Sequence, residues 1–334
     1  MDFISILSSP LELRGLALAR EGCFWRLPAE LIDKVNDGVT GLAKNTAGAR
    51  VRFRTASPSV HIRFTLTDRV LMNHFPLSGS SGADALFTFG GKTYYGGCVR
   101  PADGNTLECE GVFGCPNYSG ELSDVVMNLP LYNGISKMEL AADDGFSLEP
   151  PAPYRVERPV VFYGSSITQG GCASHPSSCY TARAASALGC DHINLGFSGS
   201  ARGEESIARY IASLDMSAFV LDYDHNAPDT EHLRATHAKF FDIIRESQPD
   251  LPVIIMTKPD FDDNIAENSA RRAIIRETYD KAVAGGDKNV RFCDGQTFFG
   301  TSGREYCTVD RCHPNDLGFA GMADAVYKAL SEFI

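Results

Sequence analysis

Four short polar segments carry the residue types that acyl-transfer chemistry requires. Residues 164–168 supply a serine hydroxyl, residues 194–199 a glycine-containing turn, residues 224–226 an amide, and residues 310–314 a carboxylate and an imidazole. A serine hydroxyl becomes a good nucleophile when a neighbouring base takes its proton. We therefore predict that Ser166 attacks an acyl group, that His313 accepts its proton, and that Asp310, three residues earlier, orients the imidazole.

Such an attack turns the acyl oxygen into an oxyanion, which needs hydrogen-bond donors fixed in advance. The sequence offers the backbone N–H groups of Ser166 and Gly199 and the side-chain amide of Asn226. Simpler roles exist for each residue. Ser166 could cap a helix, Gly199 could permit a tight turn, Asn226 could hold a turn, and His313 before a proline could be structural.

The four segments, taken together and in this order, resemble the sequence blocks of the SGNH (GDSL-type) hydrolase family. The resemblance covers residues 156–334 and implies Ser166 as nucleophile, Asp310 and His313 as acid and base, and Gly199 and Asn226 as oxyanion donors. Ser165 stands where the family commonly has Asp, Asp224 where it usually has glycine, and Ala227 where many members have Asp. The departures at Asp224 and Ala227 concern the substrate rim, and the one at Ser165 lies in the nucleophile block.

The elements that position these segments follow from the apolar pattern of the C-terminal half. Short apolar runs alternate with helical stretches, at residues 160–163, 193–195, 219–221, 253–256 and 290–293. This alternation predicts a five-stranded parallel sheet in a three-layer α/β/α domain, with helices at about 230–247 and 316–333. Ligands of such sheets bind beyond the carboxyl ends of the strands, where most of the polar segments lie.

The N-terminal half has a different pattern. Apolar residues alternate with polar ones at 51, 53 and 55 and again at 60, 62, 64 and 66, and turn residues recur between the runs. This period of two predicts an all-β sandwich of jelly-roll type. Prolines at 150, 151 and 153 read as a stiff linker, so we expect the sandwich over residues 1–155 and the hydrolase-like domain over 156–334.

Composition excludes several classes of function. The chain has 334 residues and a net charge of -11, which argues against nucleic acid or an anionic membrane as partner. No signal peptide or membrane segment is evident, so a cytoplasmic protein with its ten cysteines as free thiols is expected rather than a disulfide framework. Cys307 and Cys312 lie near His313 without a paired CxxC, so neither metal nor cofactor is predicted.

The sequence therefore predicts a serine esterase that cleaves a small acyl ester through an acyl-enzyme. By analogy with the family it resembles, an acetyl ester on a carbohydrate is the favoured substrate. Two alternatives stay open: an acyltransferase with the same triad, and a carbohydrate-binding protein with an inactive hydrolase domain. His225 could touch substrate or lie on the surface, and the oligomeric state is not determined by the sequence.

Overall fold

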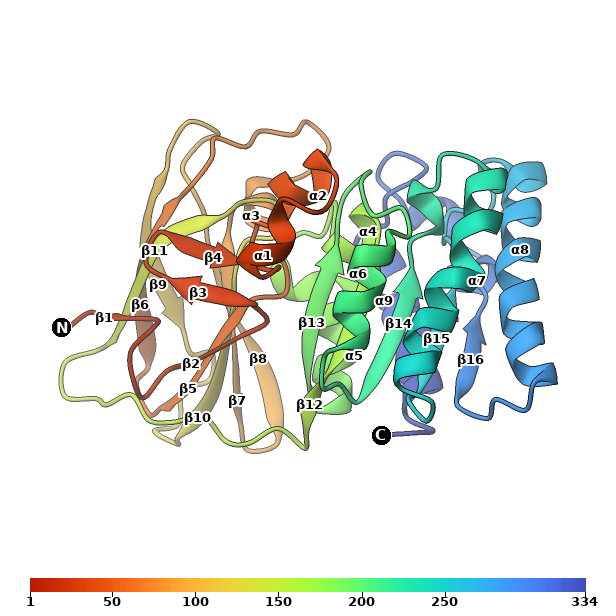
Figure 1. Cartoon of the computed structure of the whole chain (residues 1–334). Coiled ribbons are helices and arrows are strands. Elements are labelled where there is room, and N and C mark those ends of the chain that lie inside the picture. The colour runs from red at the N-terminus through yellow and green to blue at the C-terminus, as the bar shows by residue number, and fades with distance from the viewer. The chain divides into compact units, whose positions relative to one another are not determined.

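The computed structural model describes residues 1–334, which form two compact units (Figure 1). The first unit comprises Met1–Pro28, Ala43–Tyr154 and Ser174–Ser177. The second comprises Ala29–Leu42, Arg155–Ala173 and Ser178–Ile334. No helix of the chain is long and apolar enough to span a membrane.

The first unit contains two antiparallel sheets, with strand orders β1-β11-β6-β9 and β2-β5-β10-β7-β8, and a separate hairpin β3-β4. The first sheet is built from β1 (Ile4–Ser5), β6 (Ser59–Leu66), β9 (Glu108–Gly114) and β11 (Ile135–Ala142). The second is built from β2 (Glu12–Arg14), β5 (Arg50–Thr55), β7 (Ala83–Phe89), β8 (Lys92–Val99) and β10 (Ser123–Asn128). The hairpin pairs β3 (Leu18–Arg20) with β4 (Cys23–Trp25), and the short helix α3 spans Leu77–Ser80.

The core of this unit lies between the two sheets. Val51 and Phe53 of β5 and Ile62 and Phe64 of β6 belong to one buried cluster. Strand β6 alternates strictly between buried and more exposed residues, because successive side chains of a strand point to opposite faces. The predicted β-sandwich is confirmed.

The proline-rich segment after the sandwich is fastened to β5. Arg52 donates to the carbonyl of Ala152, Arg54 donates to the carbonyl of Pro150 at 2.9 Å, and the Arg52 guanidinium stacks on Tyr154 at 3.5 Å. These contacts hold the segment against the first unit up to Tyr154, where that unit's long continuous stretch ends.

The second unit is built on a parallel sheet of five strands in the order β13-β12-β14-β15-β16. The strands are β12 (Val156–Gly164), β13 (Cys190–Gly196), β14 (Ala218–Asp222), β15 (Val253–Met256) and β16 (Val290–Cys293). All residues of β14 and β15 are buried, as expected for strands covered on both faces. All five predicted strands are present, so the predicted parallel sheet is confirmed.

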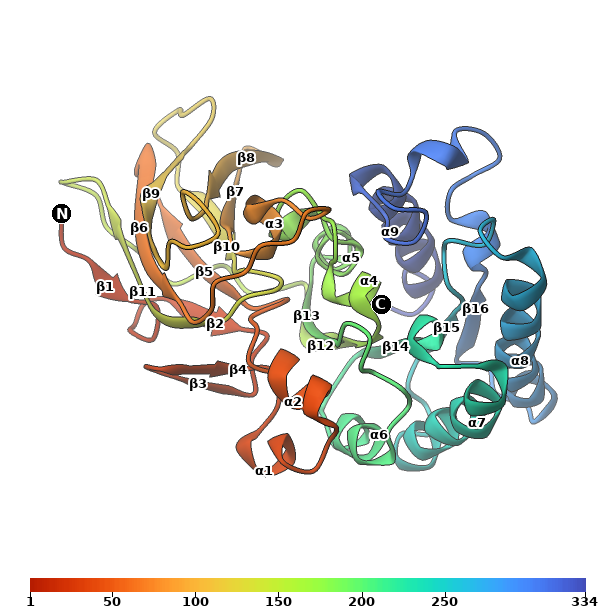
Figure 2. The ribbon, with the colours of Figure 1, turned by 90° about the horizontal axis from the view of Figure 1, so that it is seen from above.

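Helices cover both faces of this sheet (Figure 2). Helices α5 (Tyr180–Leu188) and α9 (Asp316–Leu330) lie on one face, and α6 (Glu205–Ala212), α7 (Thr230–Ser247) and α8 (Ile265–Ala284) lie on the other. Helix α7 has the predicted bounds, and the predicted apolar face of α9 is buried. The one-turn helix α4 (Ser166–Gln169) follows β12 directly.

Two segments depart from the continuous division expected at residue 155. The segment with helices α1 (Ala29–Ile32) and α2 (Asp37–Leu42) belongs to the second unit, where Asn36 donates to the Ser200 carbonyl at 3.0 Å and to Glu204 at 2.7 Å. The segment Ser174–Ser177 belongs to the first unit, where the fully buried carboxylate of Asp84 accepts from Ser177 and contacts the ring of His175. Long-range hydrogen bonds, which no local pattern encodes, decide both placements.

Candidate active site

The junction between strand β12 and helix α4 places Ser166, which is 7% exposed, at the lining of a pocket. The Ser165 hydroxyl accepts a hydrogen bond from the backbone N–H of Ile167 at 3.1 Å and so caps α4. Ser166 is the first helical residue, so its own hydroxyl is not used as the cap. Gly164 is required here, because a Cβ at that position would lie 2.0 Å from the Thr168 hydroxyl.

A tight turn before α9 brings His313 to this hydroxyl. The backbone N–H groups of Cys312 and His313 donate to Oδ1 of Asp310 at 3.1 and 2.8 Å. The second oxygen, Oδ2, lies 2.8 Å from Nδ1 of the His313 ring. One carboxylate thus fixes both the turn and the orientation of the imidazole, while Arg311 takes up a left-handed φ of 71° between them.

The three predicted residues form a continuous chain of contacts. Nε2 of His313 lies 2.9 Å from Oγ of Ser166, and Nδ1 of the same ring faces Asp310. The two ring nitrogens therefore face different partners, which lets the imidazole take a proton from the hydroxyl while the carboxylate stabilises the resulting cation. The geometry suits nucleophilic attack by Ser166.

The other two predicted residues, Gly199 and Asn226, lie in the same pocket as Ser166 and His313. Gly199 has a φ of 65°, a conformation that glycine adopts without strain. Asn226 lies in a 3-10 turn, Asp224–Asn226, and its Nδ2 donates to the Phe197 carbonyl at 2.9 Å. An amide nitrogen carries two hydrogens, so this bond fixes the side chain and leaves the second hydrogen for another acceptor.

The pocket itself encloses about 520 Å³. Its lining combines small residues with charged ones: Ser166, Ser198, Gly199, His225, Asn226, Ala227, Pro228, Lys258, Glu267, Arg271, Cys312 and His313. Four of the five predicted site residues therefore line one pocket, and the fifth, Asp310, contacts the His313 ring at 2.8 Å.

Burial and neighbouring charges set the pKa values of these groups. Burial alone would lower the pKa of His313, but Cys312 and Asp310 beside the ring raise it to about 9. Burial disfavours the ionised form of Asp310, yet hydrogen bonds from His313 hold its pKa below the usual range. Cys312 and Asp310 thus stabilise the positively charged imidazole that forms when neutral His313 takes the serine proton.

A second polar cluster adjoins the first, and sequence reasoning did not assemble it. Cys312 Sγ lies 3.3 Å from Nε2 of His225, and the same nitrogen lies 3.3 Å from Oδ2 of Asp260, which also pairs with Lys258 at 3.3 Å. Burial would lower the pKa of His225, but Asp260 and Cys312 raise it to about 10. The pKa of the Cys312 thiol, which burial would raise, is lowered to about 7 by His225 and His313.

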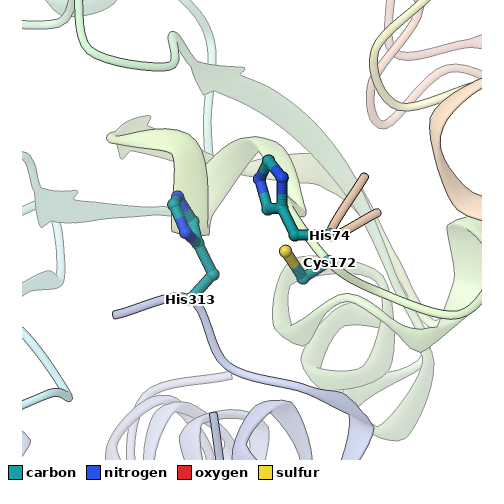
Figure 3. A group of neighbouring side chains, drawn as sticks. All are labelled: His74, Cys172 and His313. Carbon is teal, nitrogen blue, oxygen red and sulfur yellow. The ribbon is translucent and has the colours of Figure 1, made fainter. Parts of the chain in front are cut away.

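Cys172 is a second thiol near the imidazole. Figure 3 shows its side chain beside the His313 ring, with the thiol sulfur within 4.8 Å of a ring nitrogen. Burial, followed by the charges of Asp310 and Cys312, raises the pKa of Cys172 to about 12. It is therefore a neutral packing thiol, and all ten cysteines of the chain are free.

Beneath the nucleophile, Asp222 anchors α4 to the sheet. Its Oδ2 accepts hydrogen bonds from Thr168 at 2.9 Å and from the Tyr180 hydroxyl at 2.8 Å. Asp224, expected from the sequence near the substrate rim, is instead 1 % exposed, and its Oδ2 accepts from the backbone N–H of Lys258 at 3.1 Å. These two acids support the site from below.

Comparison with known proteins agrees with this architecture. Residues 157–331 match the model of the GDSL-like lipase/acylhydrolase family, and residues 1–148 match the N-terminal domain of SGNH-hydrolase-type esterases. The chain belongs to the GDSL-like lipase/acylhydrolase family. Its fold and family identify it as an SGNH-type ester hydrolase. No curated relative matches it significantly.

Several solved structures share the fold of this GDSL-like hydrolase. A GDSL-like lipase from Bacteroides ovatus is 27% identical with a TM-score of 0.86, over 99% of this chain and 97% of that one. A salicylyl-acyltransferase from a tetracycline biosynthetic pathway is 23% identical, with a TM-score of 0.79 over 99% and 97% of the two chains. A family two carbohydrate esterase from Clostridium thermocellum, solved with cellohexaose, is 14% identical with a TM-score of 0.59 over 86% and 93%.

Asp222 gives this GDSL-like hydrolase a pH-dependent stability. Burial, and then the charge of Asp224, raises the pKa of Asp222 to about 7. Because the folded-state pKa is above the unfolded value, the stabilising contribution is complete below about pH 4 and is lost as the pH rises towards 7, at up to about 1.4 kcal/mol per unit. Asp222→Asn keeps both hydrogen bonds and removes the titrating group.

We therefore expect the free energy of unfolding of Asp222→Asn, minus that of the wild type, to increase as the pH rises from 5 to 8. Unfolding in urea measures both values. Asp215→Asn, whose side chain is 83% exposed, is the matched control for the change of residue type. An equal difference between Asp222→Asn and wild type at both pH values would contradict a buried, titrating carboxyl at this position.

Proposed function

We propose that this chain is a serine esterase that removes a small acyl group, an acetyl group in particular, from a carbohydrate through an acyl-enzyme. Ser166 attacks the acyl carbon and its proton passes to His313, which Asp310 orients. The backbone N–H groups of Ser166 and Gly199 and the amide of Asn226 bind the oxyanion. His313 then protonates the leaving alcohol, and water repeats the sequence to release the acid.

One observation carries the proposal: the unbroken chain from Ser166 Oγ to His313 at 2.9 Å and from His313 to Asp310 at 2.8 Å, on a pocket that Gly199 and Asn226 also line. A merely structural histidine does not require two different partners on its two ring nitrogens. The same chain of contacts argues against an inactive domain that only binds carbohydrate.

The nature of the substrate is supported by the pocket and the relatives. Lys258, Glu267 and Arg271 line the pocket beside the catalytic residues, and such polar groups suit the hydroxyl-rich alcohol part of a carbohydrate ester. Structures that share the fold include carbohydrate esterases and an acetyl xylan esterase from Butyrivibrio proteoclasticus. An acetylated polysaccharide fragment is therefore the substrate class to test first.

A second candidate function keeps the same residues but replaces water by an alcohol acceptor. The structural alignment with the salicylyl-acyltransferase, which covers 99% of this chain, favours this acyltransferase function. An acyl-enzyme can react with any nucleophile that reaches it. Product analysis by mass spectrometry, with acetyl ester as donor and cello-oligosaccharides or xylo-oligosaccharides as acceptors, separates acid release from acyl transfer.

Replacing the proposed nucleophile tests the mechanism directly. Ser166→Ala should lower kcat on a chromogenic acetate ester by at least about 10³-fold, because no acyl-enzyme can form. A fluorophosphonate probe should label the wild type at Ser166 and leave Ser166→Ala unlabelled, as read by peptide mass spectrometry. Ser177→Ala, a serine that also contacts a histidine, is the matched control and should retain both labelling and turnover. Near wild-type turnover by Ser166→Ala would refute the mechanism.

Removing the amide donor tests the oxyanion site. Asn226→Ala should lower kcat by about 10² to 10³-fold with little change in KM, because the donor acts mainly on charge that develops in the transition state. Asn264→Ala, which removes only the cap of helix α8, controls for loss of stability and should leave kcat unchanged. A rise in KM at constant kcat would assign Asn226 to ground-state binding instead.

A further inference from the structure

The cluster of Cys312, His225 and Asp260 has the composition of a metal site. The three side chains come from the turn before α9, the loop after β14 and the loop after β15, and their ligand atoms all lie within 4.8 Å of one another. A thiolate, an imidazole and a carboxylate are the three side-chain groups that Zn²⁺ binds in proteins. The sequence could not show this, because the ligands are 35 and 52 residues apart and form no paired motif.

The spacing of the ligand atoms fits tetrahedral coordination. At metal–ligand distances of about 2.0 Å for nitrogen or oxygen and about 2.3 Å for sulfur, neighbouring ligands of a tetrahedral Zn²⁺ lie roughly 3.3 to 3.7 Å apart. His225 Nε2 is 3.3 Å from Cys312 Sγ and 3.3 Å from Asp260 Oδ2. Two of the three distances between these ligands thus match a tetrahedral site, and the third, between Cys312 and Asp260, is within 4.8 Å.

Asp260 supplies an independent sign of a missing partner. Its side chain is 4 % exposed, and its Oδ1 is buried with no hydrogen-bond partner. Burying a carboxylate with one oxygen unpaired is costly, and a cation bound to this carboxylate offsets part of that cost by neutralising its charge. The ammonium group of Lys258, 3.3 Å from Oδ2 of Asp260, is the feature that competes with a metal ion for this carboxylate.

We propose that Cys312, His225 and Asp260 bind one Zn²⁺ ion at the wall of the active-site pocket, and that the bound ion inhibits the enzyme. On binding, the thiol proton of Cys312 and the Nε2 proton of the His225 imidazolium pass to solvent, so that a thiolate, a neutral imidazole and ionised Asp260 occupy three ligand positions. The fourth position is left for water. The two anionic ligands balance the charge of the ion, so no net charge is buried.

Inhibition follows from the position of Cys312, and this part rests on the proposed function. Cys312 precedes His313, and its sulfur lies within 4.8 Å of a nitrogen of the His313 ring. During acyl transfer His313 becomes positively charged, and a Zn²⁺ ion bound to Cys312 neutralises the thiolate that would otherwise stabilise that charge at short range. Zn²⁺ should therefore lower kcat by about tenfold or more at saturation, while ester binding changes less.

Cobalt substitution tests the site without relying on activity. Co²⁺ added to the wild type and to Ser166→Ala should give one equivalent of binding, with a thiolate-to-cobalt charge-transfer band and the visible bands of tetrahedral cobalt. Cys312→Ser, His225→Gln and Asp260→Asn should each lose the charge-transfer band or weaken binding at least tenfold. Cys172→Ser, which removes the other thiol near His313, is the matched control and should keep the band.

Further variants distinguish this metal site from a second possible one that shares Cys312. Asp310, Cys312 and His313 also lie close enough to hold an ion, so a band that survives in His225→Gln and Asp260→Asn would place the metal there and overturn the proposal, as would no band in the wild type. Lys258→Met, which removes the competing ammonium, should tighten Co²⁺ binding several-fold.

Zn²⁺ should inhibit acetate-ester hydrolysis by the wild type and inhibit Asp260→Asn much less; equal inhibition of both would overturn the inhibitory role. Absence of esterase activity with the cobalt band intact would refute only the proposed function.

Discussion

The hydrogen bond between Ser166 and His313 joins residues 147 positions apart, and most of the second unit can be understood as the means of forming it. A parallel sheet places the carboxyl ends of all its strands at one edge, so loops that are distant in sequence converge there. Strand β12 lies next to β13 and β14 in the sheet, which brings residues 164–168, 194–199 and 224–226 together. The turn that Asp310 stabilises lies at the same edge and places His313 against Ser166.

The rigidity of that edge comes from buried polar groups rather than from apolar packing alone. Arg271 donates to the carbonyls of Asp224 and Ala227, and so ties helix α8 to the turn that carries Asn226. Asp224 in turn accepts from the backbone of Lys258 and links the loops after β14 and β15. Removing one member of such a network leaves a buried charge or donor unpaired, which is expensive. The same network gathers His225 and Asp260 beside Cys312, so the support of the site and the proposed metal ligands belong to one arrangement.

What the sequence could predict depends on the range of the interactions involved. The alternation in residues 60–66 and the apolar face of residues 230–247 are local patterns with periods of two and 3.6, and both predicted elements are present. The sequence could predict that Ser166, Gly199, Asn226, Asp310 and His313 lie close together, because segments that follow parallel strands converge at one edge of the sheet. The partners of Cys312 were not found, because residues 225, 260 and 312 meet only through the fold. The membership of residues 29–42 in the second unit escaped prediction for the same reason.

Composition alone does not make a catalytic site, as two serine–histidine–aspartate groups in the first unit illustrate. In one, Nδ1 of His175 lies 2.5 Å from Asp84 and 3.1 Å from Ser177; in the other, Nε2 of His61 lies 2.8 Å from Asp143 and 3.4 Å from Ser59. In each case a single ring nitrogen meets both partners, and the serine hydroxyl also donates to the aspartate directly. Such an imidazole does not bridge a hydroxyl and a carboxylate. The serine hydroxyl donates its proton in a hydrogen bond to the aspartate, so the histidine is not placed to remove that proton. In the Ser166 group, by contrast, one nitrogen of His313 faces the serine and the other faces Asp310. This geometry allows proton transfer from serine to histidine, whereas the two groups in the first unit stabilise the β-sandwich.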